Sequence, residues 1–119
     1  MTREILVVDD QPGIRLLLQE VFTNEGYHVT TVTTGKEALD RLFSKKFDLI
    51  MLDYKLPVVD GIEVLREMKD GDISTPAIIM SGLPEDISTE AEQLSPVKKV
   101  LAKPFNVQEV CDYTKSLLG

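Results

Sequence analysis

Five polar side chains stand directly after, or at the end of, short apolar runs of the chain. They are Asp9, Asp10, Asp53, Ser81 and Lys103, and the runs span residues 5–8, 49–52, 77–80 and 100–102. Apolar runs of this length are typical of strands that are buried on both faces of a sheet. Open parallel sheets bind their ligands at the carboxyl ends of their strands. If the runs are parallel strands, the five side chains should therefore line one crevice.

The elements that position these residues follow from alternating hydrophobic patterns. We expect strands at residues 5–8, 27–32, 49–53, 77–80 and 99–102, and helices at 12–25, 35–46, 60–70, 86–94 and 106–118. Pro12, Asp60 and Asn106 suit helix starts, and Gly26 suits a helix end. The helix faces that we assign to the core include Leu17 and Phe43. Five strand–helix repeats predict one α/β domain over residues 1–119, with a doubly wound parallel five-stranded sheet.

The chemistry of the five side chains favours phosphoryl transfer. Three neighbouring carboxylates raise one another's pKa, and a cation is needed to keep them ionised together. A hard divalent ion with oxygen ligands, most simply Mg²⁺, meets that need. The ammonium of Lys103 and the hydroxyl of Ser81 could neutralise phosphoryl oxygens. An aspartate can form an aspartyl phosphate, so Asp53 is the predicted nucleophile.

Each of these residues also has a purely structural interpretation. An Asp9-Asp10 pair after a strand often caps a helix, Asp53 could cap a loop, and small polar residues such as Ser81 commonly follow strands. Packing does not readily explain Lys103, because a lysine is rarely placed at the end of a buried strand. The pattern across four strand ends therefore favours chemistry over chance.

Composition narrows the function classes. The 119 residues carry a formal net charge of -7, which argues against a nucleic-acid surface. The one cysteine excludes an internal disulfide. No apolar stretch approaches the roughly 20 residues of a membrane span, and the N-terminus lacks the apolar region of a signal peptide. A cytoplasmic protein without an output domain is the expectation.

Four motifs together resemble the receiver domain of two-component response regulators over essentially the whole chain. They are residues 7–10 (VVDD), residues 52–61 (LDYKLPVVDG), residues 80–82 (MSG) and residues 103–105 (KPF). Residues 10–15 (DQPGIR), with 17–18 and 20–22, are similar to the single-domain relay regulators of sporulation phosphorelays. The resemblance implies a flavodoxin-like (βα)5 fold with strand order 2-1-3-4-5.

The resemblance also implies a role for each site residue. Asp53 would accept a phosphoryl group from a phosphohistidine, and Ser81 and Lys103 would bind the phosphoryl oxygens. The metal ligands would be Asp10, Asp53, the backbone carbonyl of Lys55 and, through water, Asp9. Mg²⁺ is the expected ion, and Mn²⁺ could substitute. The Lys103–Pro104 peptide bond is expected to be cis.

Partners follow from the same resemblance. A sensor histidine kinase or a histidine phosphotransferase would supply the phosphoryl group, and an aspartyl-phosphate phosphatase is a further expected partner. Partner contacts are expected at Gln11, Pro12, Gly13 and Arg15, beside the crevice. No nucleic acid or membrane is expected, and the default oligomeric state is a monomer.

One position departs from the family pattern. Many receivers carry an aromatic residue three positions before the lysine, and its rotation reports phosphorylation. This chain has Val100 there, so the resemblance does not extend to an aromatic switch on the face formed by the fourth helix, fifth strand and fifth helix. The helix expected at residues 86–94 lies between Leu83-Pro84 and Ser95-Pro96. We expect it to be the least regular and most mobile of the five helices.

Three further functions remain open at this point. The first is a metabolite phosphatase of the aspartyl-phosphate class, which usually has a second acid two residues after the nucleophile, where this chain has Lys55. The second is a receiver-like binding module that is not phosphorylated. The third is a receiver domain cut from a longer regulator. His28 and Cys111 are interpreted as structural residues.

Overall fold

The computed structural model describes residues 2–83, 85, 87–94 and 96–118. Strands and helices alternate along the chain, as the hydrophobic pattern predicts. The strands are β1 (Glu4–Val8), β2 (His28–Val32), β3 (Leu49–Asp53), β4 (Ala77–Ser81) and β5 (Val97–Ala102). The helices are α1 (Pro12–Asn24), α2 (Gly35–Ser44), α3 (Gly61–Asp70), α4 (Thr89–Gln93) and α5 (Val107–Leu118).

The five strands form one sheet in the order β2-β1-β3-β4-β5, and all four pairings are parallel. This is the predicted order. Val8 of β1 pairs with Leu52 of β3, so Asp9 and Asp53 leave neighbouring strands at the same level. On the other side, Asp53 pairs with Met80, the residue before Ser81. The register therefore brings three of the candidate residues to one point of the carboxyl edge.

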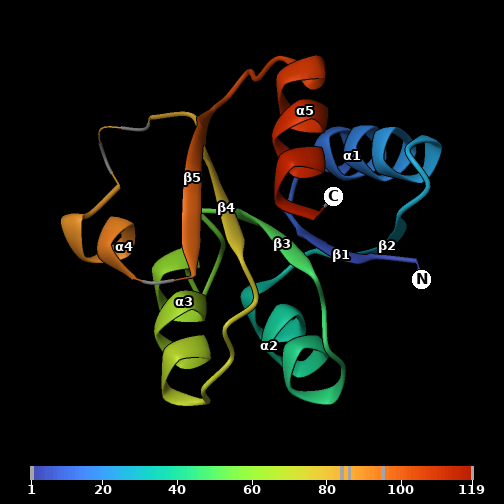
Figure 1. The fold of residues 1–119 in the computed structure, drawn as a ribbon. Helices are drawn as coiled ribbons and strands as arrows, with labels where there is room; N and C mark the ends of the chain where they lie inside the picture. The colour runs from blue at the N-terminus through green and yellow to red at the C-terminus, as the bar shows by residue number, and fades with distance from the viewer. Residues whose placement is uncertain (1, 84, 86, 95, 119) are drawn as a thin grey trace.

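Helices cover both faces of the sheet, with α1 and α5 on one side and α2 and α3 on the other (Figure 1). Each strand contributes to both layers, because successive side chains point to opposite faces. Along β1, Ile5 and Val7 pack with α1 and α5, whereas Leu6 and Val8 pack with α2 and α3. Burial on both faces explains why the strands are continuous apolar runs.

Helix starts follow the predicted capping chemistry. The Asp60 carboxylate accepts a hydrogen bond from the Gly61 N–H at 2.9 Å, and Asn106 Oδ1 accepts one from the Glu109 N–H at 3.1 Å. Pro12 occupies the first turn of α1, and Gly26 after this helix has a φ of 92°. Local sequence signals therefore determine these boundaries.

The sequence-based expectations were wrong for the length of the fourth helix, for the start of β5 and for the burial of two helix residues. The fourth helix spans only Thr89–Gln93, and β5 begins at Val97 rather than Lys99. Leu17 is 37% exposed and Phe43 is 58% exposed. The Phe43 ring lies instead against Gly71 at the end of α3, where an added Cβ would be 2.5 Å from Phe43 Cε1. Phe43 therefore packs between α2 and the end of α3 instead of against the sheet.

Part of the expected fourth helix, and residues 84 and 95 of the two proline pairs, lie outside the described residues. The expected mobility of that helix stays a prediction. Across the described ranges, the structure contains no helix with the length and hydropathy of a membrane span.

Candidate functional site

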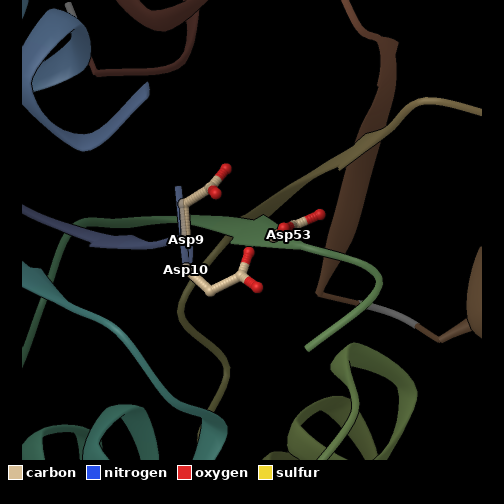
Figure 2. Close-up of side chains that lie close together, drawn as sticks. All are labelled: Asp9, Asp10 and Asp53. Atoms are coloured by element: carbon tan, nitrogen blue, oxygen red, sulfur yellow. The ribbon is translucent and has the colours of Figure 1, made fainter. Parts of the chain in front are cut away.

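Three carboxylates gather at the carboxyl edge of the sheet. Asp9 and Asp10 follow β1, Asp53 ends β3, and one oxygen of each lies within 4.8 Å of the others. Figure 2 shows the side chains projecting from these adjacent strand ends. Asp9 and Asp53 are buried, whereas Asp10 is exposed. The sheet thus places two acids in a poorly solvated position and leaves the third facing solvent.

The ammonium of Lys103 reaches into this cluster from the loop after β5. Its Nζ lies 2.8 Å from Asp9 Oδ2 and 3.5 Å from Asp53 Oδ2. It also donates a hydrogen bond to Gln11 Oε1 at 3.3 Å. One ammonium is therefore the counter-charge of two buried carboxylates, and it lies closer to Asp9.

The surroundings of Asp53 raise the pKa of its carboxyl. Burial, followed by repulsion from Asp9, raises the pKa of Asp53 from 3.8 to about 6. Attraction by Lys103 acts in the opposite direction but does not offset burial. A group of carboxylate oxygens that carries excess negative charge is the donor set that a hard divalent cation prefers. The residues present thus fit Mg²⁺.

Ser81 lies at the end of β4, next to Asp53 in the sheet. Its side chain is buried, and its Oγ accepts a hydrogen bond from the Leu83 N–H at 3.1 Å. Its carbonyl accepts one from the Lys103 N–H at 2.8 Å, which holds the lysine beside the site. The Lys103–Pro104 bond is cis, as expected. A Cβ on Gly82 would meet no atom within 4 Å, so the space beside this residue is open.

The connection from β3 to α3 is packed tightly against the end of β3. A Cβ on Gly61 would lie 2.8 Å from the Asp53 carbonyl oxygen and from backbone atoms of Tyr54. Only glycine fits there without moving the end of β3. Lys55 is exposed in this connection, and Leu56 donates its N–H to the Asp60 carboxylate at 3.3 Å. Close packing of this connection therefore fixes the backbone at Asp53.

Val58 in the same connection has a φ of 65° and is fully exposed. Left-handed backbone costs a β-branched residue about 1–2 kcal/mol, and glycine adopts it freely. We therefore expect Val58→Gly to raise the free energy of unfolding by about 1 kcal/mol, measured by urea denaturation. The matched control is Asp72→Gly, because Asp72 also has a positive φ, 57°, which aspartate tolerates better. A destabilised Val58→Gly variant, or an equal gain in both variants, would contradict this interpretation.

The predicted partner-contact residues surround the acid cluster at the start of α1. Gln11, Pro12 and Gly13 are exposed. Arg15 is half-buried, and its Nη1 donates a hydrogen bond to the Asp9 carbonyl at 2.7 Å. Arg15 therefore also supports the backbone that presents the acids, which the sequence did not indicate.

Three contacts near the site escaped the sequence analysis. Gln11 holds Lys103 through its side chain and also donates its N–H to Asp9 Oδ1 at 2.9 Å. The hydroxyl of Tyr54 accepts a hydrogen bond from the Ser88 N–H at 3.3 Å. A tyrosine directly after a buried strand was the available signal, because a buried phenol usually needs a polar partner.

His28 and Cys111 lie away from the acid cluster. His28 is exposed at the amino end of β2, and its Nδ1 lies 2.7 Å from Glu4 Oε1. Cys111 lies on α5, and burial raises the pKa of its thiol. Both agree with the structural interpretation. Val100 is half-buried on β5 and packs against the core cluster beneath α4.

The parallel order β2-β1-β3-β4-β5, with acids at the carboxyl edge and a lysine after β5, defines a receiver-type α/β domain. The chain belongs to the response regulator receiver domain family, whose model matches residues 5–115. Among curated relatives, it is 43% identical to sporulation initiation phosphotransferase F of Bacillus subtilis, over 99% of this chain and 95% of that protein.

Solved structures agree with this assignment. The response regulator TrrA of Thermotoga maritima, in complex with Mg²⁺–BeF, superposes with a TM-score of 0.88 at 34% identity, covering 98% of this chain and 100% of TrrA. TrrA in a complex with the histidine kinase ThkA gives a TM-score of 0.85, with 99% of this chain and 100% of TrrA covered.

Other curated relatives are longer than this chain. It is 35% identical to the transcriptional regulatory protein PhoP of Bacillus subtilis. The match covers 99% of this chain but only 49% of PhoP. The chain thus spans about half the length of such relatives and nearly all of phosphotransferase F. The expectation that residues 1–119 act without an output domain stays a prediction.

Proposed function

We propose that this receiver domain accepts a phosphoryl group on Asp53 from a phosphohistidine and passes the signal on within a phosphorelay. The observation that carries the proposal is the pairing of two buried carboxylates, Asp9 and Asp53, with the single ammonium of Lys103. Such an arrangement leaves negative charge uncompensated, which is unfavourable for folding alone but suits a site that must bind a cation and a phosphoryl group.

The residues that would hold Mg²⁺ are Asp10, Asp53, the Lys55 carbonyl and, through water, Asp9, and Mn²⁺ could take the same place. When bound, the ion would supply positive charge for the phosphoryl oxygens. Lys103 would pair with one of these oxygens, because its Nζ lies 3.5 Å from Asp53 Oδ2. Ser81 would donate its hydroxyl to another.

In the proposed transfer, a carboxylate oxygen of Asp53 forms a bond to phosphorus while the bond from phosphorus to the donor imidazole nitrogen breaks. The imidazole leaves with the electron pair of that bond, and the neutral ring is restored by proton exchange with solvent. Because the pKa of Asp53 is about 6, most of the carboxyl is ionised at neutral pH and can act as the nucleophile.

We further propose that the phosphoryl donor is a sensor histidine kinase or a histidine phosphotransferase. The relatives support this: one is a sporulation phosphotransferase, and TrrA forms a complex with a histidine kinase. Gln11, Pro12, Gly13 and Arg15 border the acid cluster and are the proposed contacts. An aspartyl-phosphate phosphatase is a further proposed partner, and the protein is proposed to act as a cytoplasmic monomer.

Phosphorylation by a small donor tests the proposal directly. Incubation with Mg²⁺ and acetyl phosphate should add one phosphoryl group, detected by intact mass measurement. The addition should disappear in Asp53→Ala and in EDTA, because each removes an essential part of the site. The matched control is Asp40→Ala, which removes an exposed carboxylate on α2 and should leave the addition intact.

An unmodified wild-type chain would overturn the proposal and favour a receiver-like binding module. Modification that persists in Asp53→Ala would place the acceptor elsewhere.

A further inference from the structure

The residue that follows the acceptor reaches from the site to α4. Tyr54 is only 8% exposed, and its ring packs in the core cluster that includes Ile87, Ala91 and Leu94. Its hydroxyl accepts the hydrogen bond from the Ser88 N–H at 3.3 Å, across 34 positions of the sequence. Ser88 is the N-cap of α4, so the phenol contacts the residue directly before that helix.

Few other polar contacts hold α4 to the rest of the described chain. Arg66 on α3 donates two hydrogen bonds to the Glu90 carboxylate, at 2.7 and 2.8 Å. Both side chains are about half exposed, and exposed ion pairs contribute little to stability. The bond to Tyr54 is part-buried and comes from the residue directly after β3. It is therefore a polar contact through which the site can influence the position of α4.

The same connection between β4 and α4 is also attached to Ser81. The Leu83 N–H donates to Ser81 Oγ at 3.1 Å, and the Ser88 N–H donates to Tyr54 near the start of α4. Ser81 is a proposed phosphoryl contact, and Tyr54 is the covalent neighbour of Asp53. Both attachments thus depend on residues that flank the acceptor carboxylate.

We propose that Tyr54 is a positioning residue that couples the state of Asp53 to α4, an inference that rests on the proposed function. When Ser81 turns its hydroxyl toward a phosphoryl oxygen, its bond to Leu83 lengthens and this end of the connection moves. The Ser88–Tyr54 bond, already long at 3.3 Å, then breaks, and α4 is released for a partner. In this chain, which has Val100 on β5, the phenol of the residue directly after β3 reports the state of the site.

Coupling of this kind is reciprocal, so it can be measured from either end. If phosphoryl binding breaks the Tyr54–Ser88 bond, removal of that bond in advance should make binding easier. Beryllofluoride with Mg²⁺ is the probe, because TrrA binds Mg²⁺–BeF in a similar fold. From the usual range for one hydrogen bond, we expect Tyr54→Phe to bind beryllofluoride about threefold to tenfold more tightly than wild type.

The experiment compares beryllofluoride affinity and amide hydrogen exchange, both followed by NMR. In wild type, the Ser88 amide should exchange faster after beryllofluoride binds, whereas in Tyr54→Phe it should exchange fast in both states. Tyr113→Phe is the matched control, because its hydroxyl bonds the Lys98 carbonyl at 2.9 Å on another face. This control should keep wild-type affinity and wild-type exchange at Ser88.

Ser88→Pro provides an independent removal of the same bond. Proline lacks the N–H, and the φ of Ser88, -66°, already suits it. Ser88→Ala serves as its control, because it removes only the cap from Ser88 Oγ to the Ala91 N–H. Ser88→Pro should raise the affinity relative to Ser88→Ala, and the effects of Ser88→Pro and Tyr54→Phe should not add.

The outcomes separate this inference from the proposed function. If wild type binds beryllofluoride, Asp53→Asn does not, and Tyr54→Phe matches wild type in affinity, the coupling is overturned while the acceptor site stands. If wild type fails to bind, or Asp53→Asn binds equally well, both proposals are overturned.

Discussion

Replacing Asp53 with asparagine should make the folded chain more stable in EDTA, by about 2–3 kcal/mol near pH 7.5. The reason is that the pKa of Asp53 is raised from 3.8 to about 6, chiefly by burial and by Asp9. Ionising this carboxyl at neutral pH therefore costs the folded state free energy that the unfolded chain does not lose. Asparagine removes that cost and keeps the shape of the side chain.

The pH dependence identifies the cause of the gain. Below pH 3.8 the carboxyl is protonated in both folded and unfolded chains, so Asp53 contributes no difference. Between pH 3.8 and about 6 the folded state holds the extra proton, and wild-type stability due to Asp53 falls as the pH rises. Well above pH 6 the carboxyl is ionised in both states, and the contribution of Asp53 to the free energy of unfolding falls no further.

Urea denaturation at a series of pH values would measure this difference. The advantage of Asp53→Asn should appear across that window and be absent at lower pH. Asp40→Asn, at an exposed site on α2, should change stability by less than about 0.5 kcal/mol. An Asp53→Asn variant no more stable than wild type at neutral pH would show that Asp53 is not electrostatically strained.

The opposite effect is expected for Lys103. Lys103→Met should lower the free energy of unfolding by about 2–4 kcal/mol in EDTA, because it leaves two buried carboxylates without their shared counter-charge. The ammonium lies 2.8 Å from Asp9 and 3.5 Å from Asp53, and its side chain is only 15% exposed. Added Mg²⁺ should restore part of the loss, since it supplies positive charge to the same oxygens.

A double-mutant cycle separates charge from packing. If the loss is electrostatic, Asp53→Asn should stabilise the Lys103→Met chain by more than it stabilises wild type. The control Lys36→Met, at an exposed position of α2, should have little effect. Equal gains from Asp53→Asn in both backgrounds would mean that Lys103 and Asp53 do not interact energetically.

The site was largely predictable from sequence because its residues lie at the ends of strands. Asp9, Asp53 and Lys103 each follow an apolar run, and parallel strands bring such ends to one edge. Their identity as carboxylates and an ammonium then indicated the chemistry. Helix starts at Asp60 and Asn106 were predictable for a similar reason, because caps depend on residues close in sequence.

Contacts between distant segments were not predictable. The Gln11–Lys103 bond joins residues 92 positions apart, and the Tyr54–Ser88 bond joins residues 34 positions apart. Both depend on how loops approach after the sheet has formed. Phe43 shows the same limit, since helical spacing placed it on the inner face of α2, whereas packing against Gly71 decides its direction.

The burial of Asp9 and Asp53 at one sheet edge also has an evolutionary consequence. These residues make the domain locally frustrated, because a neutral side chain at position 53 would serve folding better than the aspartate does. A domain of this fold that made no chemical use of the cluster would gain stability from a neutral side chain at position 53. It would gain nothing from losing Lys103, because the ammonium lies 2.8 Å from Asp9 and 3.5 Å from Asp53 and partly compensates both acids. The stability cost of the cluster is therefore concentrated at Asp53.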